Sequence, residues 1–221
     1  MSQTEYIRIY YDPGQTMLKK EYFEFNGKKE GEYKEYYHNA QIYEICNYIN
    51  GNKEGECKQY YDNGKLYINC MYVNDKKEGE HKSYCKNEQI YMIYNYINDE
   101  IDGEFKRYDN GQICEICNFV NGCLHGEHKE YYNTGQLRVF CNYINGKKEG
   151  ESKEYYHNGQ IFMIYNCING KVEGECKYYY DNGQIHYSYN YINGKIEGEF
   201  KSYYENGQIK ESCIYKNGKK Q

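Results

Sequence analysis

Residues 31–54 read Gly-Glu-Tyr-Lys-Glu-Tyr-Tyr-His-Asn-Ala-Gln-Ile-Tyr-Glu-Ile-Cys-Asn-Tyr-Ile-Asn-Gly-Asn-Lys-Glu. Two turn signals divide this stretch. Asn39-Ala40 occupies the place of an Asn-Gly pair in sister segments, and Asn50-Gly51 opens the second signal, Asn-Gly-x-x-Glu-Gly. Asn-Gly pairs favour tight hairpin turns because both residues tolerate positive φ. The runs between the turns are strand-like and lack a helical period, so the stretch predicts a β-hairpin.

The spacing of the turns predicts the register of the hairpin. A two-residue loop at Asn39-Ala40 and a four-residue loop at 50–53 both preserve the alternation of side chains between the two faces. The expected opposed pairs are Tyr37 with Ile42, Tyr33 with Cys46, Gly31 with Tyr48, and, across the second loop, Cys46 with Cys57. Each tyrosine opposite a glycine can cover backbone that has no side chain of its own.

The same pattern recurs along the whole chain, which predicts a single array over residues 1–221. The Gly-Glu doublets recur every 24 residues, except for one step of 23 after Gly103. An irregular first repeat spans 5–30. The regular repeats are 31–54, 55–78, 79–102, 103–125, 126–149, 150–173, 174–197 and 198–221. We expect an all-β fold, an elongated single-layer antiparallel sheet. A two-layer sandwich is the alternative, but it needs strands with a more apolar face than these.

The register divides the side chains between two faces. The tyrosine face carries the columns of Tyr37, Ile42, Tyr33, Cys46 and Tyr48. The Glu/Lys face carries parallel columns of glutamate and lysine, beginning at Glu32 and Lys34. The candidate interaction residues on the tyrosine face are Tyr37, Tyr48, Tyr61, Tyr72, Tyr96, Tyr132, Tyr143, Tyr156, Tyr180, Tyr191 and Tyr204. An aromatic strip this long exceeds the apolar patches typical of monomers, which favours its use as an interface.

The short repeat, 103–125, poses a problem of parity, since one missing residue would move every later side chain to the wrong face. We expect a bulge or an altered turn near 107–112 that keeps Cys117 on the tyrosine face.

Composition limits the class of protein. The chain has 33 tyrosines, no tryptophan and one proline, and its net charge is −5 with both signs interspersed. This charge pattern disfavours nucleic acid as a partner and weakens docking on anionic lipid. No apolar stretch of a signal peptide follows Met1, and the number of cysteines, 11, is odd. We therefore expect a cytoplasmic protein with free thiols.

The repeat resembles the MORN repeat, in the variant that reads Gly-x-Tyr-Lys-x-Tyr-Tyr-x-Asn-Gly-x-Ile followed by Asn-Gly-x-x-x-Gly. The resemblance covers nearly the whole chain. Departures are Ala40 and Glu88 in place of glycine, Asp75 and Asp99 in the second turn, and the short repeat. The resemblance implies a single-layered sheet that serves as a protein-interaction or membrane-proximal module. Some bacterial members are described as antitoxin-like, and any catalysis in the family belongs to other domains.

Two cysteine groups invite a metal or redox interpretation. In the first, Cys114-x-x-Cys117 with Cys123, positions three apart on a strand face opposite ways. In the second, the ladder Cys46, Cys57, Cys70, His81, the side chains form a line, whereas zinc prefers a tetrahedron. No pattern of paired carboxylates or of Ser, His and Asp stands out. We expect no catalytic residue, no cofactor and no metal site.

These observations favour a non-catalytic scaffold for protein–protein interaction or self-association. The partner would be another protein or a second copy of the chain. A peripheral membrane or lipid-associated module is one alternative, although no basic or lipid-insertable edge is present. A carbohydrate-binding aromatic repeat protein is the other, although such proteins usually rely on tryptophan.

Overall fold

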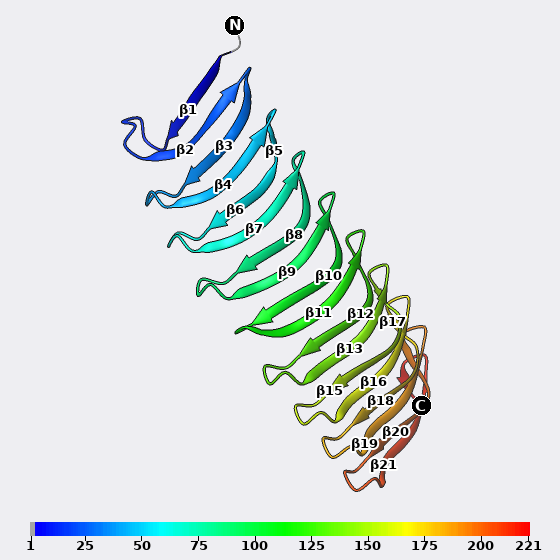
Figure 1. Ribbon diagram of the computed structural model, residues 1–221. Helices are drawn as coiled ribbons and strands as arrows, with labels where there is room; N and C mark the ends of the chain where they lie inside the picture. The colour runs from blue at the N-terminus through cyan, green and yellow to red at the C-terminus, as the bar shows by residue number, and fades with distance from the viewer. Residues whose placement is uncertain (1–2) are drawn as a thin grey trace. The chain divides into compact units, whose positions relative to one another are not determined.

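The computed structural model describes residues 3–221, and its regular structure consists entirely of β-strands joined by turns (Figure 1). The strands are β1 (Thr4–Tyr10), β2 (Leu18–Phe25), β3 (Lys28–Tyr36), β4 (Ile42–Ile49), β5 (Asn52–Lys53), β6 (Gly55–Tyr60), β7 (Leu66–Val73), β8 (Lys76–Tyr84), β9 (Ile90–Ile97), β10 (Glu100–Asp109), β11 (Gln112–Val120), β12 (Cys123–Tyr131), β13 (Leu137–Ile144), β14 (Lys147–Lys148), β15 (Gly150–Tyr155), β16 (Ile161–Ile168), β17 (Lys171–Val172), β18 (Gly174–Tyr179), β19 (Ile185–Ile192), β20 (Lys195–Tyr203), β21 (Ile209–Lys216) and β22 (Lys219–Lys220).

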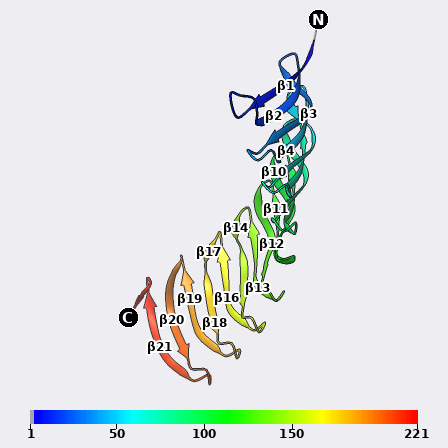
Figure 2. The same ribbon diagram turned by 90° about the vertical axis from the view of Figure 1, so that its left-hand side faces the viewer.

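The chain divides into two compact halves, Met1–Gly111 and Gln112–Gln221. Within each half, strands that follow one another in sequence pair antiparallel, from β1 with β2 to β9 with β10, and from β11 with β12 to β20 with β21. Figure 2 shows the C-terminal half as a row of successive hairpins. These pairings form one unbroken series in each half, and the described residues contain no helix that could cover the sheet, so each half is a single layer, as the sequence predicted.

The central register agrees with the prediction. Gly31 pairs with Tyr48, Tyr33 with Cys46, and Glu35 with Glu44. The same Gly–Tyr pairing recurs at Gly55–Tyr72, Gly79–Tyr96, Gly126–Tyr143 and Gly174–Tyr191. In both halves, therefore, a tyrosine lies directly opposite a glycine of the neighbouring strand.

The first turn differs from the expected two-residue loop. It contains three residues, 38–40, and is closed by the Tyr37 amide on the Gln41 carbonyl at 2.8 Å and by the Ala40 amide on the Tyr37 carbonyl at 3.0 Å. The third residue is left-handed, with φ 64° at Ala40. The extra loop residue creates a bulge, so Ile42 pairs with Tyr36. Ile42 therefore lies on the Glu/Lys face, and its predicted place opposite Tyr37 is wrong.

The second turn is tighter than the expected four-residue loop. Asn50 and Gly51 form a two-residue turn with φ of 53° and 89°, and Tyr48 pairs directly with Lys53. A bulge then follows at Gly55, whose φ is 79°. The bulge restores the register, because Ile45 pairs with Lys58 beyond it. Cys46 and Cys57 are thus cross-strand neighbours as predicted, but a two-residue turn followed by a bulge brings them together instead of a four-residue loop.

The glutamate that precedes most of the Gly-Glu doublets connects one repeat to the next. Its carboxylate accepts a hydrogen bond from the amide of the asparagine that opens the next second turn, for example Asn74 N–H to Glu54 at 2.8 Å. Equivalent bonds join Asn50 to Glu30, Asn98 to Glu78, Asn169 to Glu149, Asn193 to Glu173 and Asn217 to Glu197. This contact explains why glutamate belongs to the Asn-Gly-x-x-Glu-Gly signal.

The short repeat, 103–125, has one residue fewer than the others, and the missing residue is in its first turn. Asn110 and Gly111 both have positive φ, 49° and 78°, and strand begins at once at Gln112, so the loop has two residues instead of three. Cys117 is 1% exposed and pairs with His128, which places it on the tyrosine face. The predicted place of Cys117 is confirmed. The turn differs from that of the regular repeats, but it is the two-residue turn that the sequence had assigned to those repeats, so the predicted reason for the parity is wrong.

Candidate interaction face

The buried side chains of both halves gather on the tyrosine face. In the N-terminal half Tyr33, Cys46, Tyr48, Cys57 and Cys70 form one cluster. In the C-terminal half Tyr165, Cys167 and Cys176 form another. The small cysteines lie between large tyrosine rings, so a single layer of aromatic side chains packs on the sheet without a second layer above it.

One column of candidate tyrosines has a structural role that sequence reasoning missed. The Tyr37 hydroxyl donates to the carbonyl oxygen of Tyr60, in the next repeat, at 2.8 Å. The same bond, 23 residues forward, recurs from Tyr61 to Tyr84, Tyr132 to Tyr155, Tyr156 to Tyr179 and Tyr180 to Tyr203. We call these bonds the tyrosine staples. Tyr204, the last of the column, is 50% exposed.

The second column of candidates is the one opposite the glycines. Tyr48 is buried, whereas Tyr72, Tyr96, Tyr143 and Tyr191 are half-buried. Lysines lie over several of these rings, with Lys29 Nζ 4.6 Å from the Tyr48 centroid and Lys77 Nζ 4.9 Å from that of Tyr96. The face therefore offers positive charge as well as aromatic surface.

A hollow of about 460 Å³ opens on this face in the N-terminal half. It exists because Ser83 occupies a position that larger residues fill in most repeats: Glu35, Gln59, Arg107, Glu130, Glu154 and Tyr178. Its walls include Tyr61, Tyr67, Tyr91, Met92 and Tyr94.

Two buried polar atoms line the hollow without a hydrogen-bond partner among the described residues, His81 Nδ1 and Ser83 Oγ. His81 stacks on Tyr94 with the ring centroids 4.6 Å apart. Burial, aided by the nearby charge of Lys77, lowers the pKa of His81 to about 4, so the ring is neutral near pH 7. The hollow thus combines aromatic walls with two neutral polar groups that can bond an inserted group.

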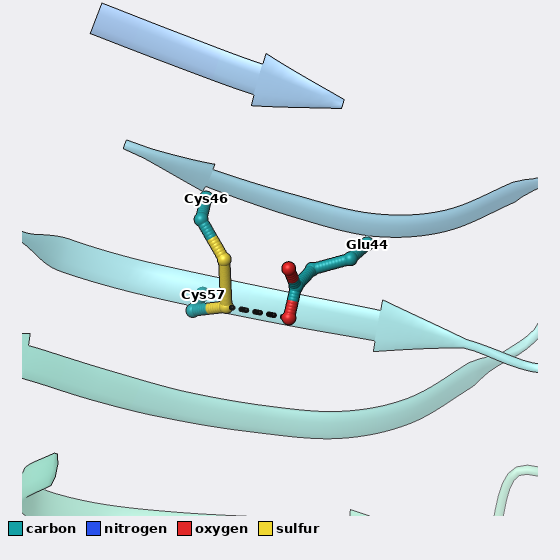
Figure 3. Close-up of side chains that lie close together, drawn as sticks. All are labelled: Glu44, Cys46 and Cys57. Atoms are coloured by element: carbon teal, nitrogen blue, oxygen red, sulfur yellow. Dashed lines mark hydrogen bonds between the residues drawn. A yellow bond between two sulfur atoms is a disulfide. The ribbon is translucent and has the colours of Figure 1, made fainter. Parts of the chain in front are cut away.

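The cysteine ladder forms in the predicted order, but its first two thiols are not free. Cys46 and Cys57 are joined by a disulfide, with their Cα atoms 4.4 Å apart (Figure 3). The expectation of free thiols is wrong here, because the register brings the two cysteines directly opposite each other. Cys57 also pairs with Cys70, whose thiol is free.

A buried carboxylate lies beside the disulfide. Glu44 is 6% exposed, and its Oε1 lies 3.0 Å from Lys53 Nζ and 2.9 Å from Gln59 Nε2. The same oxygen is 3.6 Å from Cys57 Sγ (Figure 3). The lysine and the amide compensate the charge that burial would otherwise make costly.

The Glu/Lys face carries ion pairs within single strands. Lys58 Nζ lies 2.8 Å from Glu56, two residues before it. The corresponding pairs are Lys34–Glu32, Lys82–Glu80, Lys106–Glu104, Lys129–Glu127, Lys153–Glu151, Lys177–Glu175 and Lys201–Glu199. These pairs are solvent-exposed and self-neutralising, so this face shows no concentrated charge of one sign.

A family model described as "MORN repeat variant" matches six segments, 29–50, 53–74, 124–145, 148–166, 172–193 and 196–217, which together make up more than half of the chain. Residues 75–123 lie outside these matches, yet they form the same hairpins. Repeats of this family generally form scaffolds linked to protein or membrane interaction and are generally not enzymatic.

No curated protein matches the chain. Among solved structures, the one described as "Crystal structure of GtfA/B complex bound to UDP and GlcNAc" is similar at 14% identity and a TM-score of 0.23. The similarity covers 52% of this chain and 22% of that one. The chain thus spans under a quarter of that protein's length, and we draw no argument from a likeness of this size.

Within residues 3–221, no helix has the length and apolar character that crossing a bilayer requires.

Proposed function

The chain belongs to the family of MORN repeat variants, and from this premise we propose that it is a non-catalytic scaffold whose tyrosine face binds another protein or a second copy of the chain. Binding to a protein surface needs aromatic area that can be desolvated and a few polar groups that fix orientation. The tyrosine face supplies the first, through rings that are anchored by the tyrosine staples and remain half-exposed.

The observation that carries the proposal is the hollow at Ser83. Anchor side chains at interfaces insert into concave sites near the centre of the contact. A partner side chain with an aromatic or amide group would pack against the exposed rings of Tyr67 and Tyr91 and satisfy His81 Nδ1 and Ser83 Oγ, which lack partners among the described residues. Their satisfaction only in the complex would favour binding, because unpaired buried polar groups are costly.

The test compares two variants on opposite faces. Ser83→Gln fills the hollow with the side chain that the preceding repeat already carries at Gln59, so the fold should tolerate it. Glu80→Gln alters the Glu/Lys face of the same strand. Each form is used to capture proteins from the native cell, with quantitative mass spectrometry, and its self-association is measured by light scattering.

We expect specific partners, or self-association, to be lost with Ser83→Gln and retained with Glu80→Gln. Capture and oligomeric mass that are the same for all three forms would argue against the tyrosine face. If partners or self-association were lost only with Glu80→Gln, the interface would lie on the Glu/Lys face.

A further inference from the structure

A cluster of three potential metal ligands lies on the tyrosine face of the C-terminal half. Glu115 and Cys117 are two residues apart on β11, and Cys117 pairs with His128 on β12. One carboxylate oxygen, the cysteine sulfur and one imidazole nitrogen all lie within 4.8 Å of one another. Cys117 is 1% and His128 7% exposed, and Glu115 is half-buried.

The orientation of the imidazole suits a ligand. Its Nε2 lies 2.8 Å from Glu115 Oε1, so this nitrogen faces the cluster. Its Nδ1 lies 3.7 Å from the sulfur of Cys141, on β13, which pairs with His128 from the other side. A histidine ligand is normally held through its second nitrogen by an oxygen acceptor, and here the sulfur of Cys141 takes that place.

The N-terminal half contains a related cluster at the equivalent positions of the repeat. Comparing the two clusters shows what distinguishes the one at Glu115, Cys117 and His128. Glu44 and Cys46 match Glu115 and Cys117, each within a Glu-Ile-Cys segment, and Cys57 occupies the place of His128. In that cluster the two sulfurs are consumed by a disulfide (Figure 3). In the C-terminal half a histidine faces the cysteine, and the thiol of Cys117 is free.

The side chains around the two clusters also differ. The position of Lys53, which neutralises Glu44, is occupied by Leu124, and that of Gln59 by Glu130. Glu130 lies opposite Glu115 in the sheet and pairs with Arg138. The extra carboxylate of this cluster therefore has an arginine of its own as partner.

We propose that Glu115, Cys117 and His128 bind a zinc ion, with Cys141 holding the imidazole in place. Thiolate, imidazole and carboxylate are the donors that zinc prefers, and three protein ligands leave a fourth position for water or a partner's side chain. Bonds of 2.0–2.3 Å place tetrahedral ligands about 3.3–3.6 Å apart, so donors within 4.8 Å of one another need to move by only about 1 Å. The ion would tie β11 to β12, and this assignment is independent of the proposed interaction role.

Cobalt reports directly on such a site. The reduced full-length chain is titrated with Co²⁺ without oxygen, and absorption is recorded before and after addition of Zn²⁺. We expect one Co²⁺ per chain, with the visible bands of tetrahedral cobalt and a thiolate-to-cobalt charge-transfer band in the near ultraviolet, all abolished by Zn²⁺. Cys117→Ser should remove the charge-transfer band, and Glu115→Gln should weaken binding at least tenfold.

Cys176→Ser is the matched control, since Cys176 is a buried free cysteine on the same face of the same half. Its spectrum should equal that of the unaltered chain. The assignment is overturned if the unaltered chain develops no charge-transfer band, or if a folded Cys117→Ser protein keeps it.

X-ray absorption at the zinc edge tests the unaltered chain without any substitution. One sulfur neighbour, with nitrogen and oxygen as the others, is the expected result. No sulfur, or two or more sulfurs, would refute this set of ligands.

Discussion

The ion pair of Glu44 and Lys53 allows a test of how much one charge contributes to the stability of this single-layer fold. Lys53→Met should leave the carboxylate of Glu44, 6% exposed, without its cation. We expect a loss of about 2–4 kcal/mol in the free energy of unfolding, measured by urea denaturation. Lys58→Met removes an exposed ion pair instead and should cost less than about 1 kcal/mol. Equal losses in the two variants would contradict the role assigned to burial.

His81 gives the N-terminal half a predictable response to acid. Its pKa is lowered to about 4 by burial, from an ordinary value of 6.5. Between these two pH values His81 is protonated in the unfolded chain and neutral in the folded chain. The free energy of unfolding therefore falls as the pH drops from 6.5 to 4, by up to about 3 kcal/mol. His81→Phe, which copies Phe105 of the next repeat, should remove this part of the pH dependence. An unchanged dependence of the urea midpoint on pH would refute the assignment.

At the scale of the hairpin, the backbone of the first turn is strained at Ala40, and a substitution can relieve this strain. Ala40 has a left-handed φ of 64°, where the corresponding residues Gly64 and Gly159 are glycines. Ala40→Gly should therefore raise the free energy of unfolding by about 0.5–1 kcal/mol, the relief of strain exceeding the added chain entropy. Gly159→Ala is the reciprocal control. Its new methyl group meets no atom within 4 Å, so a loss of about 1 kcal/mol would come from the backbone alone. Destabilisation by Ala40→Gly would be the contrary result.

The tyrosine staples join neighbouring hairpins, and removing one hydroxyl should show their contribution. Tyr156→Phe deletes the 2.7 Å bond to the Tyr179 carbonyl and leaves the ring in place. We expect a loss of about 1 kcal/mol and faster hydrogen exchange in residues 174–185. Tyr204→Phe alters an exposed ring of the same column and should change neither quantity. If both variants behave alike, the staples do not contribute to stability.

At the scale of the whole chain, each half has its own buried cluster and should respond to damage separately. Cys141 is 0% exposed and lies within β13, a strand of the C-terminal half that is paired on both sides, so Cys141→Pro breaks the ladder of hydrogen bonds there. Hydrogen exchange should then accelerate around 126–145 and remain slow around 31–57, since stability in repeat arrays is a sum of local terms. A uniform loss of protection in both halves would show that the array unfolds as one unit.

Much of this architecture could be predicted because period-two alternation and glycine spacing leave one register, as at Gly31 opposite Tyr48. The turn types could not, since an Asn-Gly pair suits both a two-residue turn and the end of a three-residue one, and the choice moved Ile42 to the other face. The Tyr37 hydroxyl bond escaped prediction because no pattern distinguishes a ring that packs from one that also donates. The candidate zinc cluster was hidden by the short repeat, whose register depends on the turn before Cys117.

The glutamate and tyrosine links between repeats have a consequence for synthesis. The glutamate contact spans 20 residues and the tyrosine contact 23, always to a neighbouring repeat. Each hairpin therefore finds its partners in the segment translated just before it, and none must wait for a distant part of the chain. Such a protein can fold from its first hairpin onward while the ribosome is still elongating it, with the newest strand as the growing edge.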